Sequence, residues 1–394
     1  MPSSAPQVDL LSLARLRDPL GFLSVYVDAD PHAKNAQRRP WAIAVENGLR
    51  EVRERMREQG PRERWTALER RLGELQPALA DLVDPASHGR GRALFAAVGS
   101  DEVRQIALQV PLVTRVVLDE TAFIAPLAAA LDEGRPAGFV AVSLPTVRVL
   151  DHRLGVTSEL LTLSVDPDTS EWREMKGPAA ANPARGQQSA PQRDRFERRL
   201  EEHRVRLLES AGTRLGQLVA EHGWDRLVVA GDPHLGKIVT EHVQMANGDV
   251  VLVGRTLEDL APTELAAELA PELEAATRRR ERELVERARD SALAGGHGAV
   301  GVADVLTALA EGRVSHLLYD PERELAGVRS PDGLLAPEGV VPPGVDAESL
   351  EPEPNLAERM VEAALATDAA VTPLEGEAAE ALAETDGVAA LLRW

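Results

Sequence analysis

The sequence predicts an α/β protein made of three mixed α/β domains. Short β-rich apolar runs alternate with long helix-forming segments, a pattern typical of strands covered by helices. With 394 residues, of which 44% are hydrophobic and 27% charged, the chain is long enough for two or three domain cores. We expect an N-terminal α/β domain at 1–136, a middle domain at 137–290 and a C-terminal domain at 291–394.

The N-terminal domain is expected to contain a strand, a helical region and two further strands. The apolar runs Gly21–Val27, Ala93–Val98 and Arg115–Leu118 predict strands, because β-branched and aromatic residues favour extended backbone. The charge-rich segment from Trp41 to about Leu82 is helix-forming.

The middle domain is expected to begin with a β-rich region and to continue, after a loop, as a helix and a buried strand. Gly138–Ser143, Val147–Leu150 and Leu160–Val165 predict three strands, and Leu227–Ala230 predicts a fourth. The intervening helix should end near Gly223. Its apolar positions recur at helical spacing: Phe196, Leu200, Leu207, Ala211, Leu215 and Leu218.

The C-terminal domain should follow a long helical segment from Leu257 to Asp290. An acidic, proline-rich loop or insertion is expected at Ala336–Pro354. The other expected elements are, in order, a helix at Val302–Ala310, a strand at Val314–Tyr319, a helix at Leu356–Ala366, a strand at Ala370–Thr372 and a closing segment at Gly387–Trp394.

Composition excludes several classes of protein. The chain has no cysteine, so disulfides and thiolate chemistry are excluded. The nine histidines are dispersed without an HExxH pair, and we expect no metal and no cofactor. No segment approaches the roughly 20 apolar residues that span a bilayer, and no leader is apparent. We therefore expect a cytoplasmic protein without a membrane partner.

The most informative stretch runs from Lys176 to Arg206, where a loop rich in proline, alanine and glycine enters an arginine-rich helix. The loop carries GQQSA, whose first three residues are Gly186, Gln187 and Gln188. The candidate RNA-binding residues are Arg185, Arg193, Arg195, Arg198, Arg199, Arg204 and Arg206. We expect Pro178–Gln192 to be mobile in the free protein.

The charge of this stretch has two interpretations. Because the net charge of the chain is −20, any contact with nucleic acid must be local rather than a property of the whole surface. Alternatively, Arg198 and Arg199 pair with Glu201 and Glu202 on a solvated helix face.

A second motif, GDPHLGK at 231–237, matches the start of a phosphate-binding loop but departs from it twice. Ile238 stands where a magnesium-binding serine or threonine is required, and Pro233 removes one backbone N–H from the cradle. The pattern therefore does not predict a nucleotide site.

The order of these features resembles the archaeo-eukaryotic class-1 release factor superfamily, and specifically its bacterial branch, which includes GGQ-type peptidyl-tRNA hydrolases and hibernation factors. The resemblance covers about 138–394, while 20–136 resembles only the N-terminal module of the bacterial branch. Its motifs are the GQQSA loop, the basic helix, LVVAGDPHLGK, GRVSHLLYD and the GVAALLRW terminus.

The resemblance implies an RNase H-like middle domain with a projecting GGQ-like loop at 176–195, and a C-terminal α/β/α domain similar to a ribosomal protein. It places Gln188 at the catalytic glutamine, while Gln187 stands where the family has its second glycine. Codon-reading motifs have no counterpart here, so recognition of stop codons is not implied.

Two functions follow from the resemblance. The first is a ribosome-associated peptidyl-tRNA hydrolase, active in rescue or quality control on stalled ribosomes. The second is a non-catalytic hibernation factor that occupies the tRNA A site. In both, the partners are rRNA of the peptidyl transferase centre and tRNA. The C-terminal domain would contact a translational GTPase through the acidic segment Glu348–Glu353, unless that segment is only a solvated loop.

Overall fold

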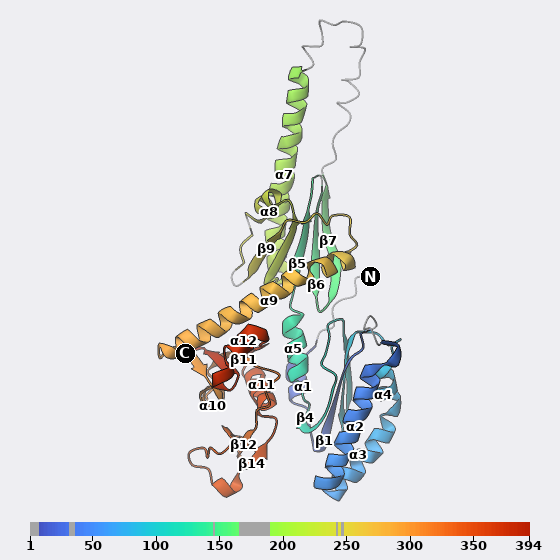
Figure 1. Ribbon diagram of the computed structural model, residues 1–394, viewed down its shortest axis with the longest axis vertical. Helices are drawn as coiled ribbons and strands as arrows, with labels where there is room; N and C mark the ends of the chain where they lie inside the picture. Colours follow the sequence, from blue (N-terminus) through green and yellow to red (C-terminus); the bar gives the residue numbers. More distant parts are fainter. Residues whose placement is uncertain (1–7, 31–35, 145, 165–189, 242, 246–247) are drawn as a thin grey trace. The chain divides into compact units, whose positions relative to one another are not determined.

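The computed structural model describes residues 8–30, 36–144, 146–164, 190–241, 243–245 and 248–394 (Figure 1). The protein is a mixed α/β fold, as predicted, and its residues group into two compact units. One unit comprises 135–276. The other comprises 3–134 together with 277–394, and the division falls inside helix α9 (Pro262–Leu293). The three-domain division at 136 and 290 stays a prediction.

The unit at 135–276 is built on a five-stranded sheet of order β7-β6-β5-β8-β9. Strand β6 runs antiparallel to β5 and β7, whereas β8 and β9 run parallel to β5. The strands are β5 (Ala137–Val142), β6 (Thr146–Arg153), β7 (Val156–Ser164), β8 (Arg226–Gly231) and β9 (Asp249–Val253). One strand antiparallel to the other four, in this order, is the topology expected of an RNase H-like domain.

Both faces of this sheet are covered by helices. Alternate side chains of a strand point to opposite faces, so Val140 packs with α7 (Ala190–His222) and α8 (Pro233–Thr240). Its neighbour Phe139 packs on the other face with Leu265 and Leu269 of α9. The predicted strands, and the helix end next to Gly223, are confirmed, while β9 was not predicted.

The unit at 3–134 and 277–394 contains a four-stranded antiparallel sheet of order β3-β2-β1-β4. Its elements are α1 (Leu10–Ala14), β1 (Arg17–Asp28), α2 (Pro40–Gln59), α3 (Arg62–Glu74), α4 (Gln76–Val83), β2 (Gly91–Ala97), β3 (Val103–Leu108), β4 (Arg115–Thr121) and α5 (Ala125–Glu133). Leu68 and Leu72 of α3 join Leu23 and Leu94 of the sheet in one core. The predicted helical region is confirmed, and Gly60-Pro61 and Leu75 divide it into three helices.

The C-terminal part of the same unit holds a second sheet of order β10-β16-β11-β15 and a small sheet of order β13-β12-β14. Its elements are β10 (Gly298–Val300), α10 (Val302–Ala310), β11 (Val314–Tyr319), β12 (Gly327–Arg329), β13 (Leu335–Pro337), β14 (Glu351–Glu353), α11 (Leu356–Ala366), β15 (Ala370–Pro373), α12 (Gly376–Glu380) and β16 (Val388–Leu392). The bounds predicted for α10, β11 and α11 are confirmed. The predicted loop at Ala336–Pro354 is wrong at both ends, because Ala336 and Pro337 belong to β13 and Glu351–Glu353 form β14, and both strands pair with β12.

A buried carboxyl joins the two segments of this unit. Glu358 of α11 is only 1% exposed, and it accepts hydrogen bonds from the backbone N–H groups of Ile124 and Ala125 at the start of α5. Ile124 has no side-chain cap of its own, so Glu358 takes the place of a helix cap from a distant part of the chain. Burial raises the pKa of Glu358 to about 8, although the two hydrogen bonds act in the opposite direction.

A tight approach of two strands fixes the end of β8. Gly231 has φ of +139°, and a Cβ atom there would lie 2.0 Å from the carbonyl oxygen of Val142. Gly223, at the end of α7, also has positive φ, of +64°, but a Cβ there would meet nothing within 4 Å. Only the first glycine is therefore required by packing as well as by backbone conformation.

Replacing Glu358 by glutamine should change how the stability of this unit depends on pH. Its folded pKa of about 8 lies above the ordinary 4.5, so the folded wild type loses stability as pH rises from about 5 through about 8. The variant cannot ionise there. Its free energy of unfolding relative to wild type should rise by up to about 1.4 kcal/mol per pH unit over that window.

Urea unfolding of both proteins between about pH 5 and pH 8 measures this difference. Any fixed cost of the amide cancels, because only the trend with pH is compared. Glu348→Gln, at an exposed position, is the matched control and should show no such trend. A constant difference for Glu358→Gln would contradict the raised pKa.

Gly231→Ala should destabilise the unit at 135–276 by more than about 2 kcal/mol, because β5 or β8 must move to relieve the contact with Val142. Gly223→Ala carries only the positive-φ strain and should cost about 1 kcal/mol. Hydrogen exchange of peptides from β5 and β8, with urea unfolding, measures both. Equal effects of the two substitutions would contradict the steric argument.

Candidate functional site

Helix α7 is held to its sheet by the part of the helix that follows residue 206. Its buried residues pack on the sheet face formed by Val140, Val149 and Val229: Leu208, Ala211, Leu215, Leu218 and Val219. The apolar spacing predicted from the sequence is confirmed at Ala211, Leu215 and Leu218, and Leu207 is partly buried. The side chains of Phe196 and Leu200 lie outside the described residues.

The C-terminal end of α7 is fixed by polar contacts to β6. The indole Nε1 of Trp224 donates to Oδ1 of Asp151 at 2.6 Å, and the ring of His222 stacks on Trp224 with centroids 5.5 Å apart. Arg153 donates to the backbone carbonyl of His222 at 2.8 Å, which satisfies one of the unpaired carbonyls at a helix end. The direction of α7 is therefore set by both packing and hydrogen bonds.

A close contact with α8 adds to this restraint. A Cβ atom on Gly212 of α7 would lie 2.7 Å from the backbone oxygen of Val239 in α8. A larger residue would push the two helices apart. This role could not be predicted, because Gly212 lies inside a helical pattern where glycine is normally unfavourable.

The N-terminal half of α7 continues as helix back to Ala190. At a rise of 1.5 Å per residue, the helix extends about 24 Å from Arg206 to its first residue. Figure 1 shows α7 running beyond the ends of the strands of its own sheet. Arg206 is exposed, and its side chain has no hydrogen bond or ion pair with the described residues.

Helical geometry sorts the candidate arginines into two groups. At 100° per residue, positions 195, 198, 199 and 206 fall on one side of α7, opposite the side that Leu208, Ala211 and Leu215 use for packing. Positions 193 and 204 fall on the packing side. Glu202 and Glu209 share the first side, so its charge is mixed.

The remaining candidate residues lie outside the described part of the chain. These are Arg185, Gly186, Gln187 and Gln188, together with the side chains of Arg193, Arg195, Arg198, Arg199 and Arg204. The expected mobile segment Pro178–Gln192 also lies there, except that Ala190–Gln192 belong to the first turn of α7.

The turn after β8 supports the exclusion of a phosphate-binding loop. Asp232 is the N-cap of α8, and its Oδ1 accepts from the backbone N–H groups of His234 at 2.7 Å and Leu235 at 3.3 Å. Two of the amides at the start of α8 are therefore already bonded to the protein's own carboxylate.

In the described part of this sheet, no buried histidine is available for acid–base catalysis. His152 on β6 bonds to Oγ1 of Thr157 at 2.8 Å and packs on Phe139, and burial lowers its pKa to about 4. It is therefore neutral at ordinary pH and serves as a packing residue. Among the described residues, no group of three or more histidine, aspartate and glutamate side chains is placed to hold a metal.

No helix in the described ranges combines the length and the apolar character needed to cross a membrane.

Comparison with known proteins identifies the segment that carries α7. Residues 136–269 match the model of bacterial archaeo-eukaryotic release factor family 5. The uncharacterized protein YocB of Bacillus subtilis (strain 168) is 23% identical over 237 residues, which span 60% of this chain and 87% of that protein.

Two solved structures are also similar. Pelota of Archaeoglobus fulgidus has a TM-score of 0.32 and 14% identity, over 77% of this chain and 79% of that chain. Dom34 of S. cerevisiae, a translation termination-like factor that interacts with Hbs1, has a TM-score of 0.40 and 10% identity, over 74% of each chain.

The match at 136–269 covers the five-stranded sheet, α7, α8 and the start of α9. It confirms the assignment expected from the order of the motifs. Residues 136–269 of this chain are therefore similar to the bacterial archaeo-eukaryotic release factor family.

Proposed function

We propose that this protein associates with the ribosome through α7 and the loop before it, and that the loop acts at peptidyl-tRNA. The observation that carries the proposal is the fixed position of α7. The segment after Arg206 is packed on the sheet, and the segment before it continues the same helix for about 24 Å. A rigid stem of this kind would hold a loop at a defined distance from the domain.

The loop would supply one group to the hydrolysis of the ester between peptide and tRNA. Gln188 would orient a water molecule towards the ester carbonyl, since positioning is a large part of what such a reaction requires. The rRNA and the tRNA ribose would stabilise the oxyanion. Gly186 would let the backbone pass close to RNA.

A second candidate function is supported by the residue at position 187. Glutamine replaces the second glycine of the family motif there, and a residue with a Cβ adopts positive φ only with strain. A loop that kept its length but lost this freedom would occupy the A site without releasing peptide. This is the hibernation alternative.

A partner for the C-terminal domain is proposed from charge complementarity alone. Glu348 and Glu351 are exposed and could meet a basic surface of a translational GTPase, whereas Glu353 is buried beside Arg359. Only the first two are therefore available to a partner.

Gln188→Ala should lower peptide release from ribosomes carrying labelled peptidyl-tRNA by about 100-fold if the loop is catalytic, because the water loses its positioning group. Co-sedimentation with ribosomes should be unchanged. Gln187→Gly restores the paired glycines and should raise release. Ribosome binding with no release from any of these proteins would support the hibernation alternative, and no binding would reject the ribosomal role.

Arg199→Ala combined with Arg206→Ala should weaken co-sedimentation and reduce its dependence on salt. For each phosphate that an arginine no longer neutralises, the slope of log K against log salt becomes shallower by roughly 0.7–0.9. The matched control is Arg55→Ala with Arg57→Ala, which removes two exposed arginines from α2. An unchanged slope in the first variant would favour arginines that only pair with neighbouring glutamates.

A further inference from the structure

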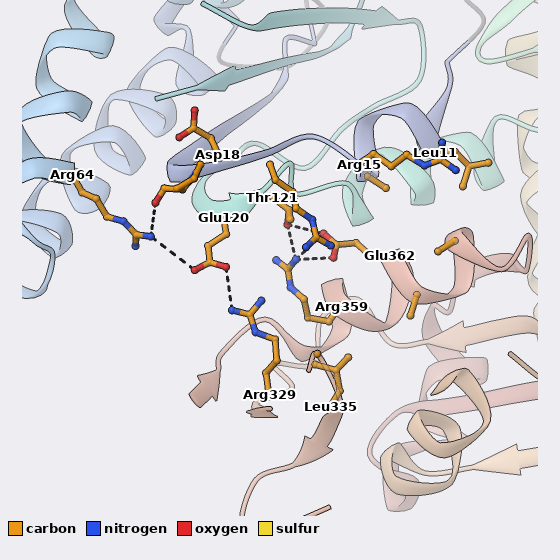
Figure 2. Close-up of a pocket in the computed structure, with 16 residues that line it drawn as sticks. Leu11, Arg15, Asp18, Arg64, Glu120, Thr121, Arg329, Leu335, Arg359 and Glu362 are labelled. Carbon is orange, nitrogen blue, oxygen red and sulfur yellow. Dashed lines mark hydrogen bonds and ion pairs between the residues drawn. The ribbon is translucent and has the colours of Figure 1, made fainter. Parts of the chain in front are cut away.

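A pocket of about 660 Å³ lies in the unit formed by 3–134 and 277–394 (Figure 2). Its walls come from α1, the start of β1, the end of β4, the strands β12 and β13, and α11, with Arg64 of α3 at one side. This volume falls within the range of about 300–1,000 Å³ that is usual for small-molecule sites.

The lining contains more basic than acidic side chains, unlike the chain as a whole. Three acidic residues, Asp18, Glu120 and Glu362, face five basic ones. The basic residues are Arg15, Arg17, Arg64, Arg329 and Arg359. Asp119, Glu351 and Glu353 also pair with Arg329 and Arg359, so the charge available to an anion comes from the remaining arginines.

Three of these arginines are committed to protein partners. Arg359 contacts Glu362 at 2.7 Å and Asp119 at 2.6 Å, and Arg329 contacts Glu120 at 3.1 Å. Arg64 donates to the carbonyl of Pro19 and lies 3.9 Å from Glu120. Figure 2 shows Glu120 between Arg64 and Arg329, and, separately, Arg359 beside Glu362 and Thr121. They build its wall and leave little charge for a ligand.

The other two arginines are uncommitted. The side chains of Arg15 and Arg17 are exposed and make no ion pair or hydrogen bond with any residue in the described part of the chain. Their backbone is nevertheless fixed. Arg15 is the C-cap residue of α1, and Arg17 pairs with Thr121 across β1 and β4. A guanidinium group offers five N–H donors and a positive charge to a ligand.

Apart from Thr121, the rest of the lining is apolar. Leu11, Ala14, Leu335, Ala363 and Ala366 contribute aliphatic surface between the charged groups. A ligand that fits must therefore present an anionic end and a less polar body. Arginine binds phosphate oxygens in a bidentate manner. A carboxylate or a hydroxyl group carries less negative charge than a phosphate and is therefore a weaker partner.

We propose that this pocket binds a phosphate-bearing small molecule, with Arg15 and Arg17 as the phosphate ligands. The apolar wall contacts the body of the molecule, and the Arg359–Asp119 pair holds α11 against β4 behind it. The site is independent of α7 and its loop, because it lies in the other unit.

Isothermal titration of the full chain tests this proposal, with inorganic pyrophosphate and adenosine 5′-monophosphate as the probes. Both should bind saturably to wild type. The variant with Arg15→Ala and Arg17→Ala should bind both probes at least about tenfold more weakly. The variant with Arg55→Ala and Arg57→Ala loses the same charge and should bind them like wild type.

A second variant separates shape from charge. Ala366→Trp at the end of α11 leaves all five arginines in place but fills part of the space beside the apolar wall. Binding of adenosine 5′-monophosphate should therefore weaken more than binding of pyrophosphate. Thermal melts without ligand check that each variant is folded. The proposal is overturned if neither probe binds wild type at millimolar concentration, if the Arg15 and Arg17 variant binds equally, or if poly-glutamate binds where both phosphates fail.

Discussion

The packing of α7 on the five-stranded sheet is the interaction on which the proposed role of this protein depends. Each fully buried leucine in that contact contributes roughly 1.5–3 kcal/mol, and Leu208, Leu215 and Leu218 are all buried. The bonds of Trp224 and Arg153 fix the same end of the helix by geometry rather than by burial. Without this contact, the residues before Arg206 would belong to a charged helix with no fixed direction.

Arginine carries nearly all of the positive charge, with three lysines among 44 basic residues. The guanidinium group forms fork-like pairs that also orient the partner, which a lysine ammonium does not. The structure uses this property inside the fold, where Arg359 holds Asp119 and Glu362 together. The same residue type therefore serves packing in one unit and, by our proposals, recognition of phosphate in both.

Elements whose apolar residues recur at helical or strand spacing could be predicted from the sequence, since the pattern is local. Helix α11 and strand β11 have the predicted bounds for this reason. Strand β3 was missed because its residues, VRQIAL, are largely exposed, and its pairing with β2 is not visible in its own composition. The motif order indicated the resemblance to the release factor superfamily, which the match at 136–269 supports. The pocket could not be predicted, because Arg17, Arg64 and Arg359 are brought together only by the tertiary fold.

The cap that Glu358 provides for α5 has a consequence for how the chain is made. The carboxyl and the amide of Ile124 are 234 residues apart, and the whole unit at 135–276 is synthesised between them. That unit can fold as soon as it emerges, because its sheet and both helical layers come from one continuous segment. The N-terminal sheet emerges first, but the cap of the helix that follows it is among the last parts to be made. The first amides of α5 stay without their cap until Glu358, near the end of the chain, has been translated.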